Sequence, residues 1–288
     1  MLLRWPRICR RQTATLPAFY VADYSNPRET PTLRSGKGHF FSAFAALNSW
    51  PMWRRNVLLW FIFVHCTYWA MGKPHHHDPF DYFDFDLRRP CAGWQAGFAD
   101  YIADQESLYE LVWAYANECT NLNQGLFISG NNHSDDLFMF IKHSICNLEP
   151  CTIYEVEACV ELWSKAPTGC IGAGGDPGEN VYVKFGAVPE EPSPVIEDDG
   201  MVRMNVDIGR QSIGGADALV IGNIATSITD CHNEQYELKE LETPAPLITR
   251  SDQSGTLWIF VGTDSGFEGK TSLIYKRLRL QIHRQECR

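Results

Sequence analysis

Glutamates and tryptophans at alternating positions are the first residues in this 288-residue chain whose types and spacing could do chemistry. Glu155, Glu157 and Trp163 fall on one side of the alternating stretch Thr152–Trp163, and Trp94 lies in another strand-like stretch. Carboxylates accept hydrogen bonds from ligand hydroxyls, and an exposed indole stacks on the apolar face of a sugar. These four residues are the candidate ligand-binding residues. A solvated glutamate face and tryptophans that fill the core are the alternatives.

Carboxylates in pairs also serve hydrolysis. A glycosidase built from Glu155 or Glu157 with Glu179 is conceivable, but the chain has no compact Ser, His and Asp signature such as a nucleophile elbow. No catalytic residue is therefore assigned. The leading interpretation is a non-catalytic binding module with carbohydrate as its ligand class. A secreted hydrolase is the alternative, and a structural or adhesion protein without a small ligand is the third interpretation.

Hard oxygen ligands for calcium occur in two polar stretches. Asn131, Asp135 and Asp136 lie in "NNHSDD", and Asp176 and Glu179 lie in the glycine-rich "GCIGAGGDPGEN". Calcium takes six to eight oxygen ligands, but no EF-hand spacing is present, so the site would have to be assembled in space. A structural calcium ion is one expectation, and solvated loop carboxylates are the other.

One apolar run decides the expected compartment. Arg54 and Arg55 precede an apolar stretch within Met52–Gly72 that is too short for a bilayer-spanning helix and ends on small residues. This pattern predicts a signal peptide, with residues 1–51 as a disordered or mispredicted extension and residues 73–288 as the mature domain. An uncleaved type II membrane anchor and a buried helix are the alternatives.

The charge and the cysteines of the remaining chain agree with export. Outside residues 1–72 the formal charge is −17, a field that repels phosphate backbones and argues against nucleic acid as a partner. The same part holds eight cysteines, which in an oxidising compartment predict up to four disulfides; buried free thiols are the alternative. Asn132 opens a sequon in a polar stretch and is a candidate glycosylation site.

Period-two alternation predicts an all-β domain. In Thr152–Trp163 apolar residues alternate with glutamates, as in a half-buried antiparallel strand. The segment Asp104–Tyr115 suits helix or strand, and Val188–Gly200 suits an exposed loop. Short strands separated by turn signals favour one two-sheet antiparallel jelly-roll β-sandwich. The other expected strands are Phe80–Asp86, Gly93–Tyr101, Gln124–Ser129, Asp136–Lys142, Asn180–Ala187, Met201–Asp207, Leu219–Ile224, Thr256–Gly262 and Ser272–Ile282.

Several blocks resemble known families. "FDFDLRRPCAGW", "CNLEPCTIYEVEACVEL" and "TSLIYKRLRLQI" are similar to the galactose-binding-like jelly rolls of carbohydrate-binding modules, although Lys276 or Arg277 replaces the aspartate usual in their last strand. "GNNHSDDLFMFIKH", "GCIGAGGDPGENVYVK" and "GTDSGFEGKTSLIY" resemble a family of exported bacterial proteins without an established function. The likeness covers about residues 80–282 and implies a shared fold. It also implies a disulfide between Cys170 and Cys231.

Overall fold

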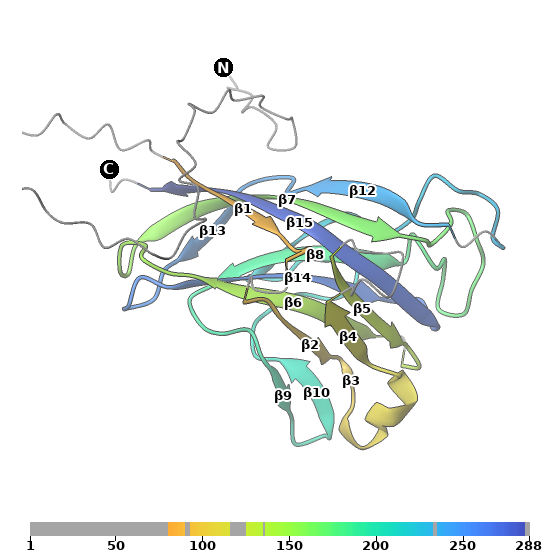
Figure 1. Ribbon diagram of the computed structural model, residues 1–288. Coiled ribbons are helices and arrows are strands. Elements are labelled where there is room, and N and C mark those ends of the chain that lie inside the picture. The colour runs from red at the N-terminus through yellow and green to blue at the C-terminus, as the bar shows by residue number, and fades with distance from the viewer. Residues whose placement is uncertain (1–79, 90–92, 116–124, 135, 233–234, 286–288) are drawn as a thin grey trace, which may run out of the picture. The chain divides into compact units, whose positions relative to one another are not determined.

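The computed structural model describes residues 80–89, 93–115, 125–134, 136–232 and 235–285, which form two large antiparallel sheets and one small one (Figure 1). The predicted signal segment Met52–Gly72 and Asp135 lie outside the described residues. Within them, no helix is long and apolar enough to cross a membrane.

Sheet A is built around two long central strands. β7 (Ile153–Ser164) pairs with β15 (Lys270–Arg284) along most of its length. The free side of β15 is shared by β5 (Leu126–Asn131) and β1 (Phe80–Asp86), and β5 also pairs with β4 (Val112–Tyr115). The free side of β7 is shared by β12 (Glu237–Glu242) and β13 (Leu247–Arg250).

Sheet B has the order β11, β8, β14, β6 and β2. Successive strands from β5 to β8, and again from β13 to β15, alternate between sheets A and B, which is the connectivity of a jelly roll. The predicted all-β antiparallel jelly-roll sandwich is confirmed. The bounds are β11 Ala218–Asn223, β8 Val181–Val188, β14 Leu257–Ser265, β6 Leu137–Ile145 and β2 Gln95–Ala99.

Burial explains why the strands of the two sheets have different sequence patterns. On β7 the predicted apolar face is at most 3% exposed from Tyr154 to Leu162, and the glutamate-bearing side faces away from the core. In β6, by contrast, the run Leu137–Ile141 is apolar at every position and buried throughout. The amino-acid sequence of a strand is apolar at every position when both faces of the strand are covered.

The second face of sheet B is covered by the segment between β8 and β11. It contains β9 (Pro194–Ile196) and β10 (Met201–Met204), which form sheet C with β3 (Tyr101–Ile102). Lys142 of β6 donates from Nζ to the Pro192 carbonyl at 2.7 Å. The expected loop Val188–Gly200 therefore contains a short strand and is fastened to the sheet.

Two sequence expectations needed correction. Asp104–Tyr115 divides into a 3-10 helix, η3 (Ala103–Tyr109), and the strand β4, separated at Glu110 with φ of 48°. The strands β12 and β13 were missed because their charged and short sequences give a weak alternation signal. The glycine-rich stretch after Cys170 forms a tight turn. Gly174 has φ of 68°, and a Cβ there would lie 2.1 Å from the Gly266 carbonyl oxygen.

Candidate functional site

The outer face of sheet A brings side chains from four strands into two neighbouring rows. The first row crosses four strands. Glu155 of β7 lies between Ile248 of β13 and His283 of β15, and His283 in turn lies opposite Phe80 of β1. In an antiparallel ladder, residues directly opposite share one face of the sheet. This row therefore places an aliphatic side chain, a carboxylate and two rings on one surface.

The second row lies two residues further along each strand. It consists of Glu157 of β7, Gln281 of β15 and Tyr82 of β1. Tyr82 is 57% exposed and Ile248 in the first row is 53% exposed, so apolar surface borders the polar groups on both sides.

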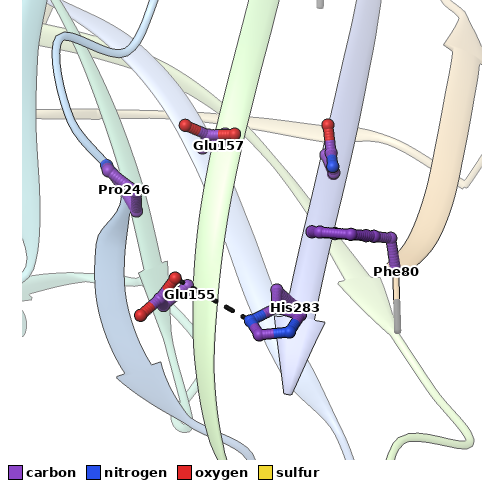
Figure 2. Close-up of a pocket in the computed structure, with 6 residues that line it drawn as sticks. Phe80, Glu155, Glu157, Pro246 and His283 are labelled. Carbon is purple, nitrogen blue, oxygen red and sulfur yellow. Dashed lines mark ion pairs between the residues drawn. The ribbon is translucent and has the colours of Figure 1, made fainter. Parts of the chain in front are cut away.

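A shallow hollow lies between the two rows (Figure 2). We call it the sheet A hollow, and it is open to solvent. Figure 2 shows Glu155 and Glu157 projecting from the same strand, with Phe80 approaching from β1 and Pro246 from the segment before β13. The lining residues are Phe80, Glu155, Glu157, Pro246, Gln281 and His283.

The first row is held in place by contacts among its own members. The Phe80 and His283 rings have centroids 4.8 Å apart. Glu155 Oε1 accepts a hydrogen bond from Gln285 Nε2 at 2.9 Å, and Glu155 Oε2 lies 3.8 Å from His283 Nδ1, too far for a hydrogen bond. His283 Nδ1 is closed off from solvent and has no hydrogen-bond partner in the described part of the chain.

Glu157 differs from the other acidic groups of this face. It is partly buried, and among the described residues it has neither a hydrogen-bond nor an ion-pair partner. Burial raises the pKa of Glu157, and the neighbouring carboxylates of Glu155 and Glu242 raise it further. An unpartnered carboxylate that is partly withdrawn from water is destabilised and gains when a donor or a cation reaches it.

Further along the same face the charges neutralise one another. Glu161, which is 6% exposed, forms ion pairs with Arg279 Nη2 at 2.9 Å and with Lys276 Nζ at 3.1 Å. Arg279 also donates to the sulfur of Cys159, a disulfide-bonded residue, at 3.4 Å. This part of the face is an ion-pair network, so the groups still able to take a ligand are those of the sheet A hollow.

The predicted ligand-binding residues are divided by the fold. Glu155 and Glu157 share the hollow, whereas Trp163 lies eight residues from Glu155 on β7, about 26 Å away at the rise of a strand. Lys276 Nζ lies 6.0 Å from the Trp163 ring centroid. Trp94 is only 3% exposed and stacks on His143 with centroids 5.1 Å apart, so it is a core residue and offers no open ring to a sugar.

In the described part of the chain, the predicted calcium ligands do not lie together at one site. Asp176 accepts hydrogen bonds from the amides of Cys170, Gly178 and Glu179 and thereby closes its own turn. Glu179 accepts from Thr168, and Asn131 donates to Glu110 on another part of the molecule. The part of the chain that the structure describes holds no group of three or more His, Cys, Asp or Glu side chains placed for a metal. Calcium stays a prediction.

Asp136, a further predicted calcium ligand, belongs to a different cluster on the covered face of sheet B. The Lys184 ammonium, fully buried, pairs with Asp264 at 2.7 Å and also donates to the Ile208 carbonyl. Asp136 lies beside Asp264, and burial together with the charge of Asp264 raises its pKa. Burial, then Asp136 and Asp264, raise the pKa of Asp100 to about 7.

The two predicted covalent modifications have different outcomes. The disulfide between Cys170 and Cys231 is confirmed, with a Cα–Cα distance of 5.8 Å. Cys146 and Cys151 are exposed free thiols. The Asn132 side chain is 2% exposed, and its Nδ2 donates to the carbonyls of Ser265 and Phe267, so the expected exposed sequon is instead a buried structural amide with no room for a glycan.

Phe80, Tyr82, Gln281 and His283 were missed as site residues. Both strands that carry them were predicted, and their alternation would have placed the four residues on one face of each strand. The pairing of β1 with β15 could not be derived from the pattern, because alternation specifies faces and not neighbours.

Comparison with known proteins gives weak structural likenesses only. No family model and no curated protein matches the chain. A mannan-recognising carbohydrate-binding module, TmCBM27, matches at 10% identity and a TM-score of 0.32, covering 71% of this chain and 99% of that chain. A family 35 carbohydrate-binding module from Clostridium thermocellum matches at 9% identity and a TM-score of 0.26, covering 69% of this chain and 97% of that chain. The K3 cleaved adhesin domain of Lys-gingipain from Porphyromonas gingivalis matches at 8% identity and a TM-score of 0.31, covering 69% of this chain and 98% of that chain. At these TM-scores the fold assignment stands on the strand pairing described above.

Proposed function

We propose that this chain is an exported, non-catalytic binding domain that takes a saccharide in the sheet A hollow. The observation that carries the proposal is the carboxylate of Glu157, which is partly buried, has no partner among the described residues and lies in a hollow bordered by the Phe80 ring. A sugar ring has an apolar face that packs on an aromatic side chain and hydroxyl groups that donate to carboxylates.

The position of the two glutamates supports binding over hydrolysis. Glycosidases place two carboxyl groups on either side of the bond to be broken. Glu155 and Glu157 project from the same strand into the same side of the hollow. Glu179, the partner considered for a hydrolase, accepts a hydrogen bond from Thr168 in the glycine-rich turn and does not line the hollow. Release of reducing sugar by the purified protein would contradict a purely binding role.

Export is supported by the disulfide between Cys170 and Cys231, since such bonds persist in oxidising compartments. Under this proposal Met52–Gly72 is the export signal, and N-terminal sequencing of secreted protein should begin at Lys73. A chain that keeps Met52–Gly72 would be held at the membrane as a type II protein.

The test of saccharide binding uses a glycan array followed by titration calorimetry on the whole protein. Glu157→Gln keeps the shape of the side chain and removes its charge, and Phe80→Ala removes the ring. Glu157→Gln should weaken binding about tenfold or more, because a hydrogen bond to a charged group contributes about 1.5–3 kcal/mol. Phe80→Ala should also weaken binding, because the sugar loses the ring on which its apolar face packs. The array is run with calcium and with a chelator, and equal binding in both would remove calcium from the site.

Glu240→Gln is the matched control for the glutamate substitution. Glu240 is exposed on β12 opposite Glu161, on the same face of sheet A but outside the hollow. Binding should be unchanged in this variant. The proposal is wrong if no saccharide on the array binds, or if a bound saccharide is held equally well by the Glu157→Gln and Phe80→Ala variants.

A further inference from the structure

The sheet A hollow has an excess of negative charge. Two of its six lining side chains are glutamates, and a third carboxylate, Glu242, lies close enough to raise the pKa of Glu157. Among the described residues, the only basic side chain that lines the hollow is His283, which is charged only when protonated.

In the part of the chain that the structure describes, neighbouring cations do not compensate this charge. The groups that act on the Glu157 carboxyl are its burial and two other carboxylates, and no basic group lowers its pKa. Arg279 and Lys276, which belong to the same face, are both bound to Glu161 instead. Glu155 has a neutral partner in the Gln285 amide. A ligand that supplied a positive charge would therefore meet the carboxylates of Glu155 and Glu157, neither of which is paired with a lysine or an arginine in the described part of the chain.

Two further features limit where such a ligand can lie. The Phe80 ring stands across the hollow from Glu155, packed on His283, so the ligand must carry a face that packs against a ring. The hollow is shallow and open to solvent, so it covers only one face of such a ligand. A hydroxylated ring with one amino group satisfies these conditions together, since the amino group reaches the carboxylates while the ring covers the aromatic surface.

We propose that the sheet A hollow is selective for a sugar unit that carries an ammonium group, held between Glu155 and Glu157 with its apolar face against Phe80. This inference rests on the proposed saccharide-binding function and names the ligand class of the same site. The amino group must be free, because N-acetylation removes its charge and adds bulk in a shallow hollow. A neutral sugar of the same size leaves Glu157 without a counter-charge and binds more weakly.

The test compares three oligosaccharides of equal length on the whole protein at about neutral pH: a glucosamine oligomer, its N-acetylated form and the corresponding glucose oligomer. We expect the glucosamine oligomer to bind at least about tenfold tighter than either of the others, a difference that follows from one additional ion contact. The preference should disappear in Glu157→Gln and persist in Glu240→Gln. A lysine-containing peptide is included to separate recognition of a sugar amine from recognition of any amine.

The outcomes separate the ammonium inference from the proposal of saccharide binding. If the neutral or N-acetylated oligomer binds as tightly as the glucosamine oligomer, the ammonium inference is wrong and saccharide binding survives. If the glucosamine preference persists unchanged in Glu157→Gln, the ammonium is bound elsewhere and the inference is again wrong. If the peptide binds and none of the sugars does, both proposals are wrong.

Discussion

The stability of the folded protein should depend on pH through Asp100, and the substitution Asp100→Asn isolates this effect. Asp100 has φ of 61°, a left-handed conformation that asparagine tolerates, so the substitution removes the charge without straining the backbone. In the folded state the pKa of Asp100 is about 7, against an ordinary value of 3.8. A difference of this size corresponds to at most about 4 kcal/mol, and partial contact with water reduces it, so we expect about 2–4 kcal/mol.

The sign follows from the direction of the shift. When the folded pKa is raised, the folded state holds its proton while the unfolded chain releases it, so stability is highest below about pH 4 and falls as the pH rises towards about 7. The wild type should lose about 2–4 kcal/mol across this window relative to Asp100→Asn. The groups with lowered pKa values, such as Asp86 at about 2, act at lower pH and cancel in the comparison of the two proteins.

The assay is urea unfolding of both proteins at several pH values between about 4 and 8, followed by tryptophan fluorescence. The difference in unfolding free energy between Asp100→Asn and the wild type should grow steadily with pH and level off above about pH 7. Asp104→Asn, an exposed position in η3, is the matched control and should follow the wild type at every pH. Parallel curves for Asp100→Asn and the wild type would refute the burial argument.

Two further predictions concern stability. Lys184→Met should lower the unfolding free energy by about 3–5 kcal/mol, because it leaves the buried carboxylate of Asp264 unpaired, whereas the exposed Lys270→Met should cost about 1 kcal/mol or less in the same urea assay. Equal effects of the two lysine substitutions would contradict the ion-pair assignment. The double substitution of Cys170 and Cys231 by serine should cost about 4 kcal/mol, as estimated from the loop of 61 residues that the disulfide closes. A loss under about 1 kcal/mol would mean that the unfolded chain is constrained in another way.

Most of the fold could be predicted from local pattern. The alternation in Thr152–Trp163 specified both faces of β7 correctly, and β1 was predicted with the bounds that the structure has. These predictions work because the side-chain period of a strand is two, and burial of one face imposes that period on the amino-acid sequence. β12 was missed because it carries charged residues on both of its faces, and β13 was missed because it has only four residues.

Residue type was a poor guide to burial for polar and aromatic side chains. Trp94 and Asn132 were predicted to be accessible and are buried. Lys184 is also fully buried, although lysine is a charged residue, because one carboxylate and two carbonyls satisfy its ammonium group. The amino-acid sequence shows that Lys184 could form an ion pair, but it does not show with which carboxylate. The partner, Asp264, lies 80 residues further along the chain. Only the folded chain brings such partners together.

The amino-acid sequence by itself determined the fold class, the acidic character of residues 73–288 and the face of β7 that carries Glu155 and Glu157. The tertiary structure decided which side chains share the hollow with them. Phe80 lies 75 positions from Glu155 in the chain, and it reaches the site only through the register of β1 on β15 and of β15 on β7. That register is a property of backbone pairing across the whole sheet, which no local pattern encodes.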